Sequence, residues 1–343
     1  MLTSENLYSH DGLYLNFEEI LKTPYKRIMI ISMRGGGKTY GCLRELHRRQ
    51  ERFIYFRRTD KALNVAMDRD MHIYSKLNRN EGWNIEPRKN TSTGIARFLD
   101  EGETVAYCFN LSTFHSIRSI GDAEALGVKW IVFDEFIPEE REPKRYDAFS
   151  AWNNADETLT RNAELEGYEV RRLLMANADT IRGEMLAGFD VADDFLMMQE
   201  TGLEIYEHSP DFLLLRPHCE KLMQLKMQTS LYKETAGSDF SEVALSNKFR
   251  VDDRQMIGSR NLSEYRSRAA IAGICIYRHK SRKGEYYISD AVSGKPKVYG
   301  RGEAERTRFI RENTAVFQAY LRNKVYYSSV KTQTIFLRVY DEI

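Results

Sequence analysis

The feature that most constrains this chain is a short apolar run that leads into three consecutive glycines. Residues 27–32 read RIMIIS, a composition typical of a buried strand, and residues 33–39 read MRGGGKT. The residues that follow, up to about position 50, favour a helix. A strand, a glycine-rich turn and a helix in this order bring backbone N–H groups and a helix N-terminus to face one anion. We therefore expect an α/β unit built around this turn.

These residues match most of the nucleotide-binding P-loop pattern, G-x-x-x-x-G-K-[ST]. Gly37, Lys38 and Thr39 fit, whereas Ser32 stands where a glycine usually opens the turn. The pattern predicts that Lys38 reaches the β- and γ-phosphates of ATP and that Thr39 ligates Mg²⁺. The predicted phosphate cradle consists of the three glycines, Gly35, Gly36 and Gly37. A glycine-rich turn without a ligand is the alternative at this point.

A second signal lies about 95 residues downstream. Residues 128–136 read VKWIVFDEF, an apolar run that ends in Asp134 and Glu135. This is the Walker-B arrangement, in which Asp134 holds the Mg²⁺ shell and Glu135 polarises the attacking water. An acid that caps a helix would give a similar pattern by itself. Together with the P-loop, the pair predicts a nucleotide hydrolase.

Three further polar residues are candidates for catalysis. Asn177 lies at the tip of the apolar run LLMAN, where a sensor residue would touch the γ-phosphate. An asparagine that starts a turn is equally compatible with the sequence. Arg161 precedes that run, and Arg118 lies in a loop-like stretch before the acidic pair. Either arginine is a candidate for a finger that completes a neighbouring subunit's site. The alternative for each is an ordinary surface arginine.

The order of elements predicts the fold class. Apolar runs at 27–32, 53–58, 104–111, 128–136 and 171–178 alternate with helix-forming segments, a pattern typical of a parallel α/β sheet flanked by helices. Residues 183–200 favour helix, and 211–218 indicate one more strand. We expect a P-loop ATPase domain at 1–205, a linker region at 206–245, and a small α+β nucleic-acid-binding domain at 246–343.

The charge of the chain divides in the same place. Residues 246–343 hold 20 Lys and Arg against 10 Asp and Glu, whereas residues 1–245 hold 31 against 40. A basic domain suggests a polyanionic partner. A hairpin at 272–294 contains the candidate nucleic-acid-binding residues Arg278, Lys280, Arg282 and Lys283. The tyrosines interleaved with them, Tyr277, Tyr286, Tyr287 and Tyr299, suit contact with the backbone or the bases of a nucleic acid. The alternative is a hairpin with a charged outer face.

Other classes of protein are disfavoured. The four cysteines are far apart and have no C-x-x-C spacing, so that neither a zinc site nor a disulfide framework is indicated. The chain has no apolar run of about 20 residues and no secretory signal pattern. We expect a cytosolic protein without a membrane partner.

Several motifs occur in an order that resembles one family. MRGGGKT, FIYFRRTDKAL, NLSTFHSIRS, WIVFDEF, ETLTRN and MANAD, followed by a basic C-terminal domain, resemble the phi29-type phage genome-packaging ATPases. The resemblance implies an ASCE-type P-loop fold with a vestigial RNase H-like C-terminal domain. It also implies an ATP-driven motor that translocates double-stranded DNA into a preformed capsid. The expected assembly is a homo-oligomeric ring, expected to be a pentamer, in the host cytoplasm and transiently on the portal (connector) vertex.

The resemblance assigns roles to the residues already singled out, with Asn177 as the γ-phosphate sensor and Arg161 or Arg118 as the finger. The segment 163–169, AELEGYE, lengthens the loop beyond Arg161 relative to the family. The sequence leaves open whether a scaffold RNA joins the motor. Two rival functions also stay open: a terminase-like enzyme that cuts DNA, with Glu285 and Asp290 in its nuclease site, and an ATP-gated nucleic-acid-binding switch.

Overall fold

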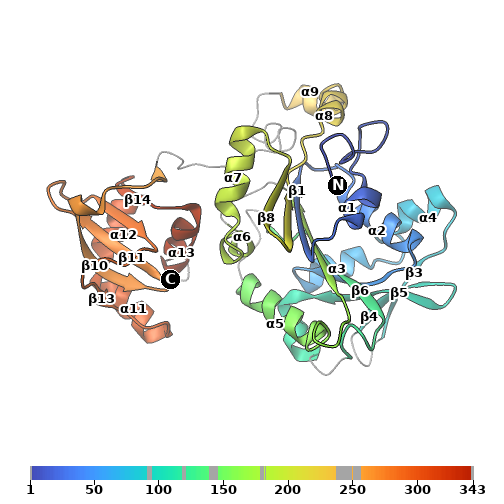
Figure 1. The fold of residues 1–343 in the computed structure, drawn as a ribbon, viewed down its shortest axis with the longest axis horizontal. Helices are drawn as coiled ribbons and strands as arrows, with labels where there is room; N and C mark the ends of the chain where they lie inside the picture. Colours follow the sequence, from blue (N-terminus) through green and yellow to red (C-terminus); the bar gives the residue numbers. More distant parts are fainter. Residues whose placement is uncertain are drawn as a thin grey trace. The chain divides into compact units, whose positions relative to one another are not determined.

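A computed structural model describes residues 2–90, 95–117, 121–138, 146–177, 181, 183–236, 249 and 256–340. The chain divides into two compact units (Figure 1). The larger unit contains residues 1–180 and 197–250, and the smaller unit contains residues 181–196 and 251–343. Each unit has a sheet and a hydrophobic core of its own.

The larger unit is built on a nine-stranded sheet. In spatial order its strands are β3 (Glu86–Lys89), β4 (Ala96–Asp100), β5 (Glu103–Asn110), β2 (Arg52–Arg57), β6 (Val128–Asp134), β7 (Arg171–Asn177), β1 (Arg27–Ser32), β9 (Phe212–Leu215) and β8 (Ile205–Ser209). The six strands from β5 to β9 pair in parallel, so their carboxyl ends meet at one edge of the sheet. The predicted parallel α/β fold class is confirmed.

Helices cover both faces of this sheet. One face packs on α1 (Phe17–Lys22), α2 (Lys38–Arg48), α3 (Asp60–Ala66) and α4 (Ser75–Glu81) through the core that includes Ile28, Ile30 and Tyr55. The opposite face packs on α5 (Ala148–Thr160) and the 3₁₀ helix η1 (Leu111–Ile117). There Trp152 of α5 stacks on Phe133 of β6 with ring centres 5.3 Å apart. Burial on both faces explains why the parallel strands appear as continuous apolar runs.

The edges of the sheet differ from the expectation. β3 and β4 form an antiparallel hairpin that gives no apolar run, since β3 reads EPRK and is mostly exposed. β8 and β9 form a second hairpin, and β9 pairs with β1. The sheet therefore continues to Leu215, beyond the expected boundary at residue 205. Two helices follow it within the predicted linker, α8 (Glu220–Met227) and α9 (Ser230–Glu234).

The smaller unit is a five-stranded sheet packed on helices. Its strands in spatial order are β13 (Lys297–Val298), β10 (Tyr265–Ile271), β11 (Ile274–His279), β12 (Tyr286–Ser289) and β14 (Val325–Tyr327). Its helices are α6 (Glu184–Gly188), α11 (Glu303–Glu312), α12 (Thr314–Tyr320) and α13 (Val330–Tyr340), while α7 (Ala192–Thr201) spans the division between the units. Ala272 and Gly273 both have positive φ, as a two-residue turn between β10 and β11 requires. A small α+β unit is thus present, as predicted.

The tyrosines expected to contact bases lie inside this smaller unit. Tyr277, Tyr286, Tyr287 and Tyr299 are each at most 5% exposed. Tyr286 and Tyr299 belong to the core beneath α11 to α13, and Tyr277 and Tyr287 to a cluster on the other face of the sheet. Their periodicity reflects burial on both faces of the sheet, so the expectation that they contact a nucleic acid was wrong. The four cysteines are also buried, and none of the described helices is long and apolar enough to span a membrane.

Candidate nucleotide site

The glycine-rich turn joins β1 to α2 at the carboxyl edge of the parallel strands. Gly35 and Gly37 have φ values of 75° and 81°, in the left-handed region that glycine adopts without strain. Gly37 is the N-cap of α2 and has no side chain to bond the first helical N–H groups. The helix N-terminus is thus available to an anion, as the P-loop pattern predicts.

Lys38 is held at the base of the turn by two polar side chains. Its Nζ lies 2.8 Å from Asn177 Oδ1 and 3.1 Å from Ser32 Oγ. The register of β1 and β7 pairs Ser32 with Asn177, which brings both side chains to one place. Ser32 therefore supplies a hydrogen bond that the usual glycine could not. A Cβ at Gly36 would lie only 3.3 Å from Ser32 Oγ, so the turn remains closely packed there.

The first acid of the DEF motif faces the turn. Asp134 ends β6 and is 1% exposed, and its Oδ2 accepts hydrogen bonds from Thr39 Oγ1 and Tyr55 OH, both at 2.8 Å. Burial, with Asp134 beside it, raises the pKa of the Tyr55 hydroxyl, which keeps it a donor. A hydroxyl and a carboxylate are the hard oxygen ligands that Mg²⁺ prefers, and Mg²⁺ commonly takes only one or two protein ligands beside phosphates. Thr39 and Asp134 therefore fit the predicted metal site.

The second acid occupies a strained backbone position. Glu135 follows β6 directly and has a φ of 57°, a left-handed conformation that is unusual for a residue with a side chain. Its side chain is 56% exposed. Non-glycine residues in this region cost of order 1–3 kcal/mol and are concentrated at functional sites. The turn directs the Glu135 carboxylate out of the sheet and toward Arg57.

Arg57, which the sequence did not single out as a site residue, contacts both acids. It ends β2, the strand next to β6, and its Nη1 lies 3.2 Å from Asp134 Oδ2 while its Nη2 donates to Glu135. Burial opposes the charged form, but the Tyr55 hydroxyl and the two carboxylates outweigh it and raise the pKa of Arg57. Arg57 lies in the motif FIYFRR. Its position beside the two acids follows from the pairing of β2 with β6, which the sequence does not reveal.

Arg161 lies at the opposite edge of the sheet. It is the C-cap of α5. The last turns of this helix lie near the start of β7, because Asp156 Oδ1 of α5 accepts a hydrogen bond of 2.9 Å from Arg172 Nε of β7. From Arg172 to Asn177 the strand spans about 17 Å, since a strand rises about 3.3 Å per residue. Arg161 is therefore separated from the phosphate loop of its own chain. Arg118, the other candidate finger, lies outside the described residues.

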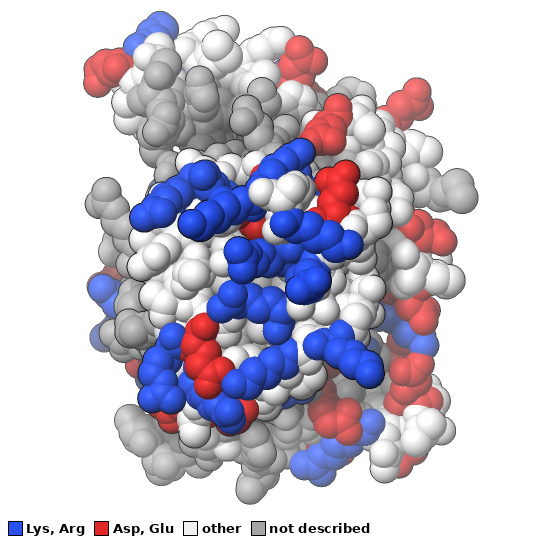
Figure 2. All heavy atoms as spheres, turned by 90° about the vertical axis from the view of Figure 1, so that its left-hand side faces the viewer, with Lys and Arg blue, Asp and Glu red and all other residues white. Residues whose placement is uncertain are grey.

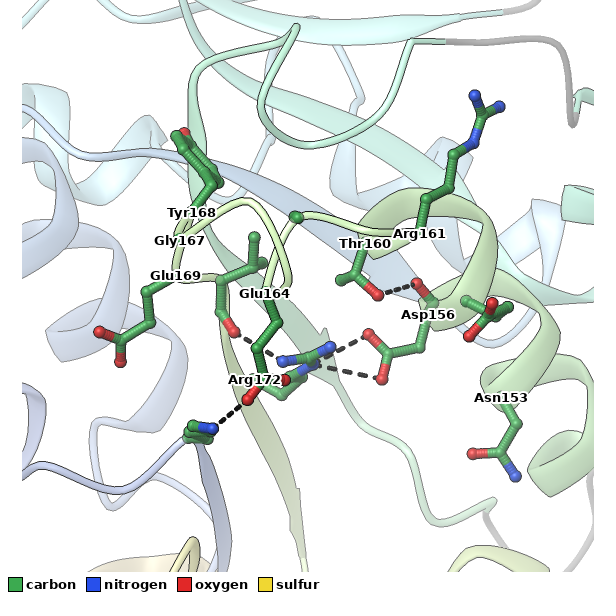
Figure 3. Close-up of a pocket in the computed structure, with 13 residues that line it drawn as sticks. Asn153, Asp156, Thr160, Arg161, Glu164, Gly167, Tyr168, Glu169 and Arg172 are labelled. Carbon is green, nitrogen blue, oxygen red and sulfur yellow. Dashed lines mark hydrogen bonds and ion pairs between the residues drawn. The ribbon is translucent and has the colours of Figure 1, made fainter.

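Arg161 borders a pocket of about 500 Å³ whose charges are largely paired (Figure 3). Arg172 pairs with Asp156, and Lys26 pairs with Glu164 of the loop at 163–169. The Arg161 side chain extends away from these pairs (Figure 3), and its Nε donates to the Thr158 carbonyl at 3.1 Å.

The loop at 163–169 is fixed by contacts of its own. Tyr168 OH donates to the Val128 carbonyl at 3.0 Å, and Lys129 Nζ lies 3.8 Å from the centre of the Tyr168 ring. Lys26 holds Glu164 near the start of this loop. This loop is therefore anchored beside the amino ends of β1 and β6.

A family model covers most of the chain. Residues 10–299 match the model of the podovirus DNA encapsidation protein, Gp16. The chain belongs to this family. Two solved structures are similar over nearly the whole length: the phi-28 gp11 DNA packaging motor, with a TM-score of 0.65, 17% identity and coverage of 94% of this chain and 96% of that one, and the phi-29 viral genome packaging motor assembly, with a TM-score of 0.66, 18% identity and coverage of 96% and 99%. No curated protein matches the sequence.

Membership makes this chain a viral DNA-packaging protein and directs attention to the basic residues of the smaller unit. Figure 2 shows Lys and Arg gathered on the face turned to the viewer. Arg278 is exposed on β11 directly across from the exposed Arg266 of β10. Like charges in such a pair are destabilising unless an anion lies over them.

The other predicted basic residues differ in their partners. Lys280 Nζ donates to the Ser263 carbonyl at 2.7 Å, and Arg282 lies 3.4 Å from Glu285. Lys283 is exposed in the turn. Within the described part of the chain, neither Arg278 nor Lys283 forms an ion pair. These two side chains therefore have the most accessible charges of the four.

The two acids considered for a nuclease site have different surroundings. Burial raises the pKa of the Asp193 carboxyl, and the neighbouring carboxylates of Asp190, Asp194 and Asp290 raise it further. Glu285 is 8% exposed and accepts a hydrogen bond of 2.9 Å from Tyr265 OH. Arg260 and Arg282 lie 3.8 and 3.4 Å from the same carboxylate. Among the residues that the structure describes, no three His, Cys, Asp or Glu side chains are placed to hold a metal ion.

Proposed function

We propose that the chain is the ATP-hydrolysing motor subunit that drives double-stranded DNA into the capsid. The observation that carries this proposal is the convergence at one sheet edge of Lys38, Asn177 and the hydrogen-bonded pair Thr39 and Asp134. Family membership indicates the process in which the chain takes part, DNA encapsidation. The candidate nucleotide site indicates that ATP hydrolysis is its energy source.

The residues divide the work of hydrolysis as follows. The turn at 35–37 and the N-terminus of α2 bind the phosphates, and Lys38 neutralises their charge. Mg²⁺, when bound with ATP, would stabilise the charge that develops on the transferred phosphoryl group. Thr39 and Asp134 would hold it. Glu135 orients the attacking water once it leaves Arg57, and Asn177 contacts the γ-phosphate.

A ring of subunits provides the remaining parts. We propose that Arg161 completes the site of a neighbouring copy. Because Arg161 is distant from the phosphate loop of its own chain, it would contact a nucleotide only when that nucleotide is bound to another subunit. Hydrolysis in one subunit then depends on how the next one packs. The ring is proposed to be pentameric and mounted on the portal in the host cytoplasm, with DNA held by basic residues of the smaller unit, Arg278, Lys280, Arg282 and Lys283.

The decisive experiment is ATPase activity measured with and without double-stranded DNA, together with the oligomeric state in solution. A ring whose turnover rises when DNA is added is the expected result. Negligible turnover that DNA does not change, with DNA affinity altered by ATP, would instead support a nucleic-acid-binding switch. A monomer insensitive to DNA in both respects would contradict the motor.

A second candidate, a packaging enzyme that also cuts DNA, is tested separately. Supercoiled plasmid is incubated with the protein and Mn²⁺, and the Asp290→Ala variant serves as the control. We expect no nicking by either protein, because Glu285 is engaged by Tyr265 and two arginines. Nicking by the wild type that the variant lacks would establish a nuclease.

A further inference from the structure

Helix α8 lies along the phosphate loop, although the sequence places it in the linker. Leu222 and Cys219 are buried with Met33, the first residue of the loop, and Met223 packs against the same cluster. The Cys219 thiol lies 3.1 Å from the Gly12 carbonyl oxygen, to which it donates. These contacts fix the helix to the loop and to the N-terminal segment.

The last turn of α8 brings an ammonium group onto the loop. Lys226 Nζ donates to the Arg34 carbonyl, and a Cβ built at Gly35 would lie 2.9 Å from the same Nζ. Lys226 is partly buried, whereas Leu225 and Met227 beside it are about half exposed, at 47% and 54%. The side chain therefore lies over the middle of the turn that binds phosphate.

The charge of Lys226 has no carboxylate partner among the described residues; its hydrogen bond is to a neutral carbonyl. Burial lowers the pKa of this ammonium group. A partly desolvated cation bonded to a neutral acceptor gains from an anionic acceptor, because charge-assisted hydrogen bonds are roughly twice as strong. The flexible stem of lysine allows Nζ to move from the carbonyl to a neighbouring oxygen.

We propose that Lys226 is a second phosphate-binding lysine, which α8 supplies to the nucleotide held on the loop. This inference rests on the proposed nucleotide site and adds a ligand contact from outside the P-loop pattern. Lys38 approaches the phosphates from the base of the turn and Lys226 from the side of Gly35. The nucleotide would thereby be bonded to α8, which precedes the residues of the smaller unit in the sequence.

The test is nucleotide binding by the full chain, measured by titration of fluorescent ATP and ADP analogues in the presence of Mg²⁺. Lys226→Gln is expected to weaken binding about 10- to 100-fold, the effect of losing one hydrogen bond to a charged group. Lys226→Arg should recover part of the affinity, because the charge remains. Lys221→Gln is the matched control, since Lys221 lies on the same helix and donates to the Asp11 carbonyl instead; its affinity should be unchanged.

A chemical readout covers the case in which a variant fails to fold. Acetylation of Lys226 in the wild-type protein, followed by peptide mass spectrometry, should slow when ATP is added, whereas acetylation of Lys221 should not. Equal nucleotide affinity in wild type and a folded Lys226→Gln variant, or no protection of Lys226 by bound ATP, would overturn this inference and leave the proposed function intact. A wild-type protein that binds no nucleotide would overturn the proposed function itself.

Discussion

Replacement of Arg57 by alanine should destabilise the larger unit, because it leaves a buried carboxylate without its cation. Asp134 is 1% exposed, and among the described residues it would keep hydrogen bonds from Thr39 and Tyr55 alone. Glu135 contributes little to the loss, since its side chain is 56% exposed and water can solvate it.

The size of the loss follows from the geometry. Arg57 Nη1 lies 3.2 Å from Asp134 Oδ2, and two unit charges at that separation attract by about 5 kcal/mol at an effective dielectric of about 20. The desolvation of the guanidinium offsets part of this attraction. Removal of one partner of a buried pair costs about 3–5 kcal/mol in measured cases, and we expect a loss in this range.

The assay is urea unfolding followed by tryptophan fluorescence. The protein has three tryptophans, Trp83, Trp130 and Trp152, and all lie in the larger unit. Tryptophan fluorescence therefore reports the unfolding of the larger unit alone, and the assay gives the free energy of unfolding of that unit.

Two variants separate charge from hydrogen bonding. Tyr55→Phe removes one hydrogen bond to the same carboxylate and should cost about 1.5–3 kcal/mol. Combining Asp134→Asn with Arg57→Ala removes the unpaired charge and should recover much of the lost stability. A loss below about 1 kcal/mol in Arg57→Ala, or no recovery in the double variant, would refute the reasoning.

Three further predictions concern function. Lys38→Ala and Glu135→Gln should each abolish hydrolysis, but the Gln variant should still bind ATP; normal turnover by it would exclude Glu135 from its role. Mixed rings of Arg161→Ala and Glu135→Gln subunits should recover part of the ATPase activity, because an intact finger and an intact site then meet in trans; absence of recovery in assembled mixed rings would count against this. Arg278→Ala should weaken DNA binding and reduce the slope of log affinity against log salt by about 1, whereas a slope equal to wild type would place Arg278 away from the phosphates.

The parts of the fold that could be predicted from the sequence are those in which one segment determines its own structure. β1 begins and ends at the predicted residues, and β2, β5, β6 and β7 agree within one or two, because strands buried on both faces are continuous apolar runs. β9 is shorter than predicted and ends at Leu215, before the expected end at 218. The polar hairpin of β3 and β4 lacked this signal. The tyrosines of the smaller unit were misinterpreted, since alternation with basic residues is equally compatible with a buried sheet.

The site residues that belong to the P-loop, the Walker-B strand and the sensor strand could be predicted from the sequence. Lys38, Thr39, Asp134 and Asn177 meet because β1, β7 and β6 are neighbours with parallel register. Arg57 and Lys226 could not be assigned, because their positions depend on the pairing of β2 with β6 and on the docking of α8 on the loop. Such neighbour relations are set by packing between distant segments.

The backbone of Glu135 bears on what this position is for. A glycine would adopt its φ of 57° without strain, so requirements of folding alone would favour glycine there. The chain instead holds a carboxylate in a conformation that opposes stability. Any search for stabilising substitutions would select against the acid at this position, and the gain in stability would come with the loss of the group that we propose orients the attacking water. With the role proposed for Glu135, thermal stability and packaging activity place opposite demands on this residue.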